Sequence, residues 1–336
     1  MDTICNVMAL TTEALLLALS KKVHGDREHN IVCNFKGAEA TQVWKQRKQG
    51  IFHRVFQLLF WEDDEELDDD PEYLELEKFS QKHRTLALAW SPETSLNVFP
   101  KTVAFCSAAS DHKLRLYNSD LAANSTLQEL RGHTDYINAV AYDPYGEYVV
   151  STSDDHTCRV WSLKELPGQC ITNIRLLSPG MSVACHQSEE GKLLVGEKCG
   201  VLSLFNLVSG QAILSFDSNR SPLLSADWSS NTSLYAVAVV AGEIVIWDTT
   251  NPSHPLETCS AHVEGSECVR FSPLNHSYIA TIGQPKHQLK ITHLASPHPI
   301  LVTNLQLTGG LTWHYRLPYV CVGNDRKLCM WKIATK

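Results

Sequence analysis

Histidine, serine and aspartate are the side chains that nucleophilic hydrolases combine, and they occur close together in one stretch of this chain. His133 is followed by a serine, either Ser151 or Ser153, then by Asp155 and by Trp161. A hydrolase would also need an exposed hydroxyl and an oxyanion pocket, and nothing in the stretch predicts either. Buried polar side chains need partners, and these residue types can supply one another with hydrogen bonds. We therefore expect a structural hydrogen-bond chain of His133, Ser151, Asp155 and Trp161, not a catalytic triad.

No other pattern in the chain has the spacing of an active site, a metal site or a phosphate site. The 15 histidines form no HxH or HExxH pattern, and the 11 cysteines include no CxxC pair. The glycines lack the spacing of phosphate-binding loops. Most cysteines fall inside strand-like runs, which favours buried, reduced thiols in a cytosolic or nuclear protein. The sequence therefore predicts no enzyme, no metal, no cofactor and no small-molecule substrate.

The elements that must position the four polar side chains lie between Gly132 and Trp161. A Gly-His pair is followed by an apolar run, by a turn at residues 143–146 and by a second apolar run. The Asp155-His156 turn then leads into a third strand that ends on Trp161. Three short strands separated by turn residues predict an antiparallel meander. The Gly-His start and the terminal tryptophan are typical of one blade of a WD40 β-propeller.

The same pattern repeats from residue 83 onward at intervals of about 43 residues, the period of WD40 blades. The strand that opens each repeat reaches an aromatic or equivalent residue at Trp90, Tyr142, Cys185, Trp228, Phe271 and Trp313. The strand that completes the inner meander reaches an anchor at Tyr117, Trp161, Phe205, Trp247, Thr292 and Trp331. A turn is expected six residues before each anchor. The residues that directly follow these six turn positions are, in chain order, His112, His156, Gly200, Gly242, His287 and Arg326. Glycine adopts a positive φ most easily, and histidine tolerates it better than most side chains.

We therefore predict an all-β fold, a seven-bladed WD40 β-propeller. Residues 83–336 would form six blades, and residues 1–82 would supply a divergent first blade and the strand that closes the ring. Because the chain stops just after Trp331, on the third strand of its last blade, the outer strand of that blade must come from the N-terminal segment. Within that segment, Thr11 to Val23 favours a short helix, with glutamate early and lysine late.

The negative charge of the chain is concentrated in one acidic stretch, residues 62–72. The chain carries a net charge of -8, and these residues hold nine acidic side chains, so the remainder comes to +1. A nearly neutral body argues against direct binding of nucleic acid. A solvated loop is the simpler interpretation of the acidic stretch, and a docking site for a basic partner is the alternative. The candidate partner surface would then consist of Glu62, Asp63, Asp64, Glu65, Glu66, Asp68, Asp69 and Asp70.

The N-terminal apolar run, Ala14 to Leu19, does not predict a membrane span or a secretory signal. It is far too short to cross a bilayer. A basic leader and a small-residue cleavage site are also missing, which argues against a signal peptide. We therefore expect no membrane insertion.

Residues 176–183 read LLSPGMSV and residues 309–314 read GGLTWH. Together with six other segments, they resemble the small WD-repeat nucleoporins of the Y-shaped outer-ring complex of the nuclear pore. The likeness runs in order from about residue 83 to the C-terminus, although Cys185 stands where an aromatic residue is usual. The segments SPGMSV and GLTWH are more specific than a general WD pattern. The likeness is carried by residues 88–94 (LAWSPET), 132–138 (GHTDYIN), 153–161 (SDDHTCRVW), 176–183 (LLSPGMSV), 211–215 (QAILS), 298–302 (HPILV), 309–314 (GGLTWH) and 317–331 (LPYVCVGNDRKLCMW).

The resemblance implies a non-enzymatic scaffold subunit at the nuclear envelope, supporting nucleocytoplasmic transport and pore assembly. Its partners would be the large propeller and helical-solenoid nucleoporin of the short arm of the Y and a chromatin-binding nucleoporin. It also implies a role at kinetochores in mitosis. The alternative is a WD40 scaffold, or a peptide-reading or histone-reading adaptor, of another nuclear or cytoplasmic complex. A ubiquitin-ligase receptor of the WDxR type is not predicted, because Trp247-Asp248 is followed by two threonines.

Overall fold

All regular elements that the structure describes are β-strands. The computed structural model divides the chain into two compact units, residues 85–304 and residues 1–84 with 305–336. No described segment is a helix, so none of them could cross a membrane as a helix. The residues described are 6–10, 15–22, 29–35, 38–44, 54–60, 74–95, 99–122, 124–164, 167–229, 235–296, 298–306, 308–314, 318–324 and 327–333.

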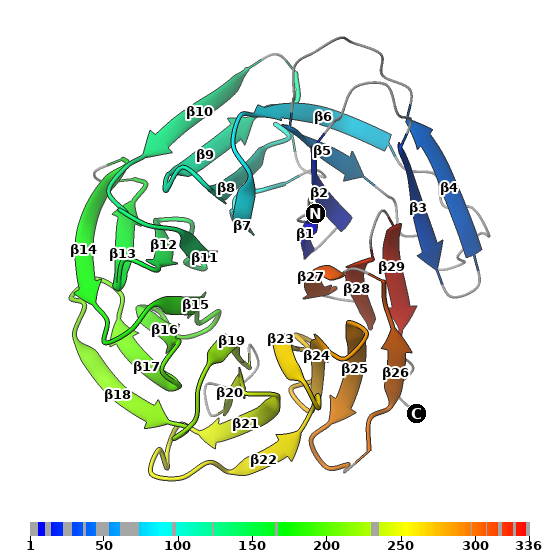
Figure 1. The fold of residues 1–336 in the computed structure, drawn as a ribbon. Helices are drawn as coiled ribbons and strands as arrows, with labels where there is room; N and C mark the ends of the chain where they lie inside the picture. The colour runs from blue at the N-terminus through cyan, green and yellow to red at the C-terminus, as the bar shows by residue number, and fades with distance from the viewer. Residues whose placement is uncertain are drawn as a thin grey trace. The chain divides into compact units, whose positions relative to one another are not determined.

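The larger unit contains five four-stranded antiparallel sheets, which we call blades I to V, each made from four consecutive strands (Figure 1). The inner strand of each blade contacts the inner strand of the next, so the five blades follow one another along an arc. Blade I contains β7 (Thr85–Trp90), β8 (Val103–Ala109), β9 (Leu114–Ser119) and β10 (Ser125–Leu130); blade II contains β11 (Ile137–Tyr142), β12 (Tyr148–Ser153), β13 (Thr157–Ser162) and β14 (Gln169–Arg175); blade III contains β15 (Gly180–Cys185), β16 (Lys192–Glu197), β17 (Val201–Asn206) and β18 (Ala212–Asp217); blade IV contains β19 (Leu223–Trp228), β20 (Tyr235–Val240), β21 (Glu243–Asp248) and β22 (Glu257–Ser260); blade V contains β23 (Gly265–Phe271), β24 (Tyr278–Gln284), β25 (Gln288–His293) and β26 (Leu301–Asn304).

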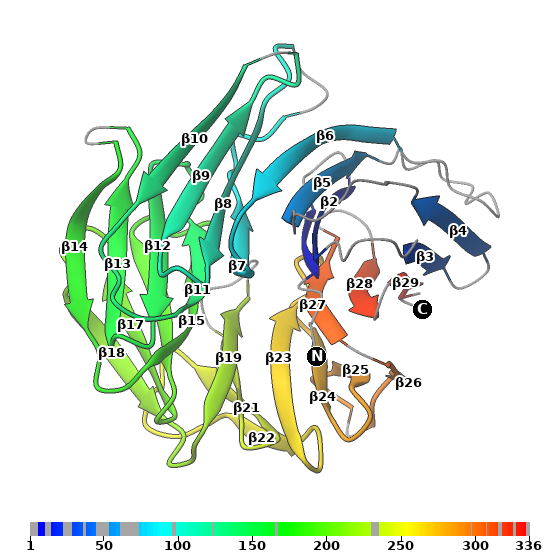
Figure 2. The ribbon, with the colours of Figure 1, turned by 45° about the horizontal axis from the view of Figure 1, so that its top comes forward.

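Burial falls from the inside of each blade to its outer strand. The second strands β12, β16 and β20 each carry five successive buried residues, because neighbouring blades cover both faces of the sheet. These strands therefore do not alternate between buried and exposed residues: β20 is a continuous apolar run, and the buried residues of β12 include Ser151, Thr152 and Ser153. The outer strands β10 and β14, which lie at the periphery of their blades (Figure 2), are mostly exposed and carry threonine, glutamine and asparagine.

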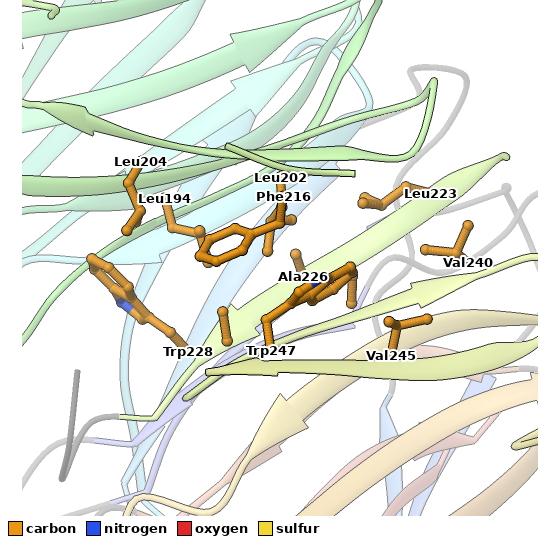
Figure 3. Packing of buried hydrophobic residues seen from close by; sticks show 12 residues of the cluster. Leu194, Leu202, Leu204, Phe216, Leu223, Ala226, Trp228, Val240, Val245 and Trp247 are labelled. Carbon is orange, nitrogen blue, oxygen red and sulfur yellow. The ribbon is translucent and has the colours of Figure 1, made fainter. Parts of the chain in front are cut away.

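Large side chains fill the space between consecutive blades. Between blades III and IV, Phe216 is fully buried against the indole of Trp247, with ring centroids 5.8 Å apart. Figure 3 shows this cluster, in which leucines of blade III interleave with side chains of blade IV. Each aliphatic or phenyl side chain buried in this way contributes about 1.5–3 kcal/mol of favourable transfer free energy.

The hairpin between the second and third strands of each blade turns on a residue with positive φ. In blades I, II and V that residue is a histidine, with φ of 62° at His112, 60° at His156 and 45° at His287. In blades III and IV it is Gly200 or Gly242, with φ of 102° or 89°. The expected turn positions are confirmed at these five residues. Arg326, the sixth, lies outside the described residues.

The smaller unit contains two further sheets. One is antiparallel, with the strand order β1-β2-β5-β6, and the other has five strands in the order β27-β28-β29-β3-β4. In the second sheet β3 lies parallel beside β29, so a segment near the N-terminus supplies the strand next to the last strand of the chain (Figure 2). The strands are β1 (Asn6–Leu10), β2 (Leu15–Lys22), β3 (His29–Phe35), β4 (Ala38–Trp44), β5 (Arg54–Phe60), β6 (Leu74–Gln81), β27 (Thr308–Trp313), β28 (Tyr319–Asn324) and β29 (Lys327–Lys332).

Two sequence-based expectations differ from the structure. The helix expected over residues 11–23 is wrong, because residues 15–22 form strand β2, which pairs with β1 on one side and β5 on the other. Such pairing outweighs a local helix preference. Seven like blades are not found either: the described strands form six four-stranded sheets, and the remaining sheet has five strands because the hairpin β3–β4 joins the three-stranded β27–β29.

Candidate functional site

The polar residues singled out in blade II lie in one continuous hydrogen-bond chain. His133 belongs to the loop before β11, Ser151 to β12, Asp155 to the turn after β12, and Trp161 to β13. The His133 Nδ1 atom lies 2.8 Å from a carboxylate oxygen of Asp155, and its Nε2 atom lies 2.8 Å from Ser151 Oγ. The indole N–H of Trp161 donates to the same hydroxyl at 2.9 Å. The loop before the blade is thus connected to its second and third strands.

The hydrogen-bond donors around His133 determine which of its ring nitrogens carries the hydrogen. Because the indole can only donate, the hydroxyl of Ser151 accepts from it and donates its own hydrogen to Nε2 of His133. The Nδ1–H of His133 then donates to Asp155. Burial lowers the pKa of His133 and outweighs the opposite effect of Asp155, so the ring is neutral at pH 7.

The Asp155 carboxylate is held by more than the imidazole. Its second oxygen accepts the backbone N–H and the hydroxyl of Thr157 at 3.0 and 2.6 Å, and the first also accepts the N–H of Thr134 at 3.1 Å. Burial alone would raise the pKa of Asp155, but the hydrogen bonds from Thr157, His133 and Thr134 lower it below its usual value. The carboxylate is therefore ionised, and both of its oxygens accept hydrogen bonds from groups within the blade.

This geometry supports a structural role for the chain. Ser151 is fully buried, and its hydroxyl is occupied by both His133 and Trp161. Ser153, the other serine considered from the sequence, is also fully buried and instead donates to the carbonyl of Asp135. Neither hydroxyl is available to attack a substrate, because a nucleophile must reach the reacting carbon.

Blade V contains an incomplete version of the same arrangement. His262 occupies the place of His133, and its Nε2 atom lies 3.1 Å from the hydroxyl of Thr281. Lys286 stands where blade II has its aspartate, and Thr292 where it has its tryptophan. The Nδ1 atom of His262 has no hydrogen-bond partner within the described part of the chain. Blade V therefore keeps the histidine but lacks the complete chain.

The other site residues predicted from the sequence do not join the hydrogen-bond chain of blade II. The anchors Tyr117, Phe205 and Trp247 are buried in the cores of blades I, III and IV, and Trp331 is partly exposed on β29. The acidic residues 62–70 lie outside the described residues. Among the side chains that are described, no group of three or more His, Cys, Asp and Glu could hold a metal ion.

Sequence reasoning missed a second set of polar residues, which join one blade to the next. Asn138 donates from its side chain to the backbone of Gly180 at 3.0 Å, between blades II and III. The Ser182 hydroxyl donates to the carbonyl of Ala226 at 2.8 Å and accepts its N–H at 3.1 Å. Equivalent contacts join blade IV to blade V, where Ser225 accepts the N–H of Val269 and Asp227 that of Phe271. The sequence did contain a signal for these contacts, because the residues that contact each other lie one blade period apart.

Comparison with known proteins identifies the family. Residues 124–162 match the family described as WD domain, G-beta repeat, and this segment runs from just before β10 to the end of β13. Nucleoporin Nup37 of mouse is 39% identical over 264 residues, which cover 77% of this chain and 80% of the relative. The human Nup37 has the same identity and coverage, and Nup37 of Drosophila melanogaster is 39% identical over 74% of this chain and 77% of its own length. The chain belongs to the Nup37 family.

Membership of the Nup37 family agrees with the geometry of blade II. The matched WD repeat includes all four residues of the buried chain, whose hydrogen bonds are satisfied inside the blade. Nucleoporins and WD-repeat propellers are typically structural proteins. The fold is therefore a WD40-type β-propeller, and the likeness to nucleoporins and WD-repeat proteins indicates interactions with other proteins.

Proposed function

We propose that this protein is a structural scaffold subunit of the nuclear pore complex, in the Y-shaped outer-ring subcomplex. The observation that carries the proposal is the 39% identity to nucleoporins over 77% of the chain. This match is several times longer than residues 124–162, the segment that the general WD-repeat family model matches. The division of the chain at residue 82, into a divergent N-terminal segment and the WD-type repeats of residues 83–336, belongs to this proposal.

The geometry of the larger unit supports a scaffold role. Side chains join blade II to III, III to IV and IV to V through backbone hydrogen bonds. Such a unit presents a preformed surface, so little conformational entropy is lost when a partner docks. The expected interface is large and permanent.

We further propose two docking partners and their consequences. One is the large propeller and helical-solenoid nucleoporin of the short arm of the Y, and the other is a chromatin-binding nucleoporin. Binding to these partners would place the protein at the nuclear envelope and support pore assembly, protein transport and mRNA transport. Recruitment to kinetochores in mitosis is part of the same proposal.

The proposal is tested by fusing a fluorescent affinity tag to the endogenous gene. We expect a punctate rim at the nuclear envelope, and we expect outer-ring nucleoporins to be the most enriched proteins in a mass-spectrometric analysis of the purified complex. Enrichment of an unrelated complex together with a diffuse signal would favour a WD40 adaptor of another assembly and would contradict the proposal.

A further inference from the structure

Three loops at one end of blades IV and V have the same unusual composition. They connect β21 to β22, β23 to β24 and β25 to β26. Each loop contains one large aliphatic side chain that is exposed and one histidine close to it in sequence. The pairs are Leu256 with His254, Leu274 with His276 and Ile300 with His298.

Direct contacts join the two loops of blade V to each other and to the strand of blade IV that pairs beside the third loop. Within blade V, the N–H of Leu294 donates to the carbonyl of Ser277 at 2.8 Å, which joins two of the loops. Across the blade boundary, the ring of Tyr235 stacks on His276 with centroids 5.9 Å apart. Tyr235 also pairs with Asp248, which directly precedes the loop of blade IV. We call this surface, residues 249–256, 272–277, 294–296 and 298–300, the IV–V rim.

The aliphatic side chains of the rim are held in place by the backbone but are not buried by it. The N–H of Leu256 donates to Ile246 and the N–H of Ile300 to Ile291, both at 2.7 Å, so the two residues occupy equivalent positions in neighbouring blades. Leu256, Ile300 and Leu274 are nevertheless 59%, 52% and 44% exposed. Apolar side chains gathered at the surface, with polar residues around them, mark interaction sites.

The rim contains no lysine, arginine, aspartate or glutamate. The corresponding loops of the earlier blades are charged: Lys164 lies 3.4 Å from Glu93 and 3.9 Å from Glu147, at the end of blades I and II. Blade III carries an ion pair of Lys192 with Glu189 at the same end. The β17–β18 loop of blade III, residues 207–211, is also uncharged, so within the larger unit it is only in blades IV and V that all the described loops at this end lack charged residues.

The absence of charge restricts what can bind there. Nucleic acids and anionic membranes are attracted by clusters of lysine and arginine, which the rim lacks. A charged peptide would lose hydration of its charges without gaining a partner for them. The centre of a protein–protein interface, in contrast, is depleted in charged residues and rich in apolar ones. The composition of the rim matches such a centre.

We propose that the IV–V rim is the docking site for an uncharged, apolar surface of another protein of the pore scaffold. This inference rests on the proposed function, since it assigns the docking face for that scaffold. Leu256 and Ile300 insert into the partner, Leu274 extends the contact, and the histidines form its polar margin.

The test compares two double variants of the tagged full-length protein in its native cells. Leu256→Glu with Ile300→Glu places two carboxylates in the rim. The matched control, Leu127→Glu with Ile213→Glu, changes two side chains of similar exposure on the outer strands β10 and β18. We expect recovery of outer-ring nucleoporins, measured by mass spectrometry, to fall at least tenfold for the rim variant and less than twofold for the control. Melting temperatures of both purified variants should remain within 2 °C of the wild type, roughly the effect of a neutral surface change.

Four outcomes would overturn the inference. If the wild type and the rim variant recover the same nucleoporins equally, docking occurs on another surface and the proposed function stands. If the wild type recovers no nucleoporins, the proposed function and the inference both fail. If light scattering shows a dimer of the wild type that the rim variant loses, the occupant is a second copy of this chain. If vesicles of phosphatidylcholine, alone or with phosphatidylserine, bind the wild type and not the rim variant, the occupant is a lipid surface.

Discussion

The imidazole Nδ1 of His133 lies 2.8 Å from the carboxylate of Asp155, and this contact joins the loop before blade II to the turn after its second strand. Both side chains are almost completely buried, with 1% and 5% of their surface exposed. A buried polar pair of this kind stabilises the blade only while every donor and acceptor remains occupied.

Replacing the central histidine is expected to destabilise the protein without removing an activity. In His133→Ala, the hydroxyl of Ser151 and the carboxylate of Asp155 each lose a buried partner, so the free energy of unfolding should fall by about 1–3 kcal/mol. Urea denaturation followed by tryptophan fluorescence measures this. The exposed His254 provides a control, because His254→Ala should leave the midpoint unchanged. An esterase activity of the wild type that disappears in His133→Ala would contradict the structural role.

Acidification should weaken the fold through buried histidines. Burial, with a smaller contribution from Lys290, lowers the pKa of His262 to about 4 from 6.5. The unfolded chain therefore takes up a proton at a higher pH than the folded one, so stability is complete above pH 6.5 and falls as the pH is lowered toward 4. His133 is shifted in the same direction.

The contribution of His262 can be isolated with a side chain that does not titrate. Glutamine can still place a polar atom near the hydroxyl of Thr281. The urea concentration at the unfolding midpoint should therefore decrease less between pH 7 and pH 5 in His262→Gln than in the wild type. Equal losses in the wild type and in His262→Gln would show that other groups govern the acid sensitivity.

Gly200 is needed both for its positive φ and for a close contact with the backbone, whereas Gly191 is needed only for its positive φ. Gly200 has a φ of 102°, and a Cβ there would overlap the carbonyl oxygen of Arg220. Gly191 also has a positive φ, 76°, but its nearest neighbour, an amide nitrogen of Asn206, is 3.8 Å away. Gly200→Ala should therefore lower the free energy of unfolding by about 3 kcal/mol or more, against about 1 kcal/mol for Gly191→Ala. Calorimetry of both variants measures the difference, and equal effects would show that the contact with Arg220 is unimportant.

The hydrogen bonds between blades should also be measurable one at a time. Ser182→Ala removes both contacts with the backbone of Ala226 and should lower the free energy of unfolding by about 1–2 kcal/mol. Hydrogen exchange should increase most at the N–H of Ala226, at the boundary between blades III and IV. Ser253→Ala, at an exposed position, should change neither quantity. Unchanged exchange at Ala226 would contradict a role for Ser182 in joining the blades.

Repetition is what made much of the fold predictable from the sequence. An all-β WD-repeat propeller is confirmed, because blades of one period place turn residues and large side chains at regular intervals. Trp90, Tyr142 and Trp228 are each the last residue of an inner strand, as their spacing indicated. The residues of the buried chain could be named for the same reason, since a Gly-His pair and a terminal tryptophan define where each one lies in a blade.

Contacts between distant segments could not be predicted in the same way. The sequence of residues 11–23 favours a helix locally, yet the backbone of residues 15–22 pairs with β1 and β5. The sequence predicted that the N-terminal segment would supply the strand beside the last one, but it did not predict that this segment would add two strands, β3 and β4, to the sheet. By itself the sequence determined the period, the turns and the side chains buried within each blade, since these depend on neighbours a few residues away. The tertiary structure alone decided how many strands complete the last sheet and which exposed side chains lie on the IV–V rim, because both depend on segments brought together only by folding.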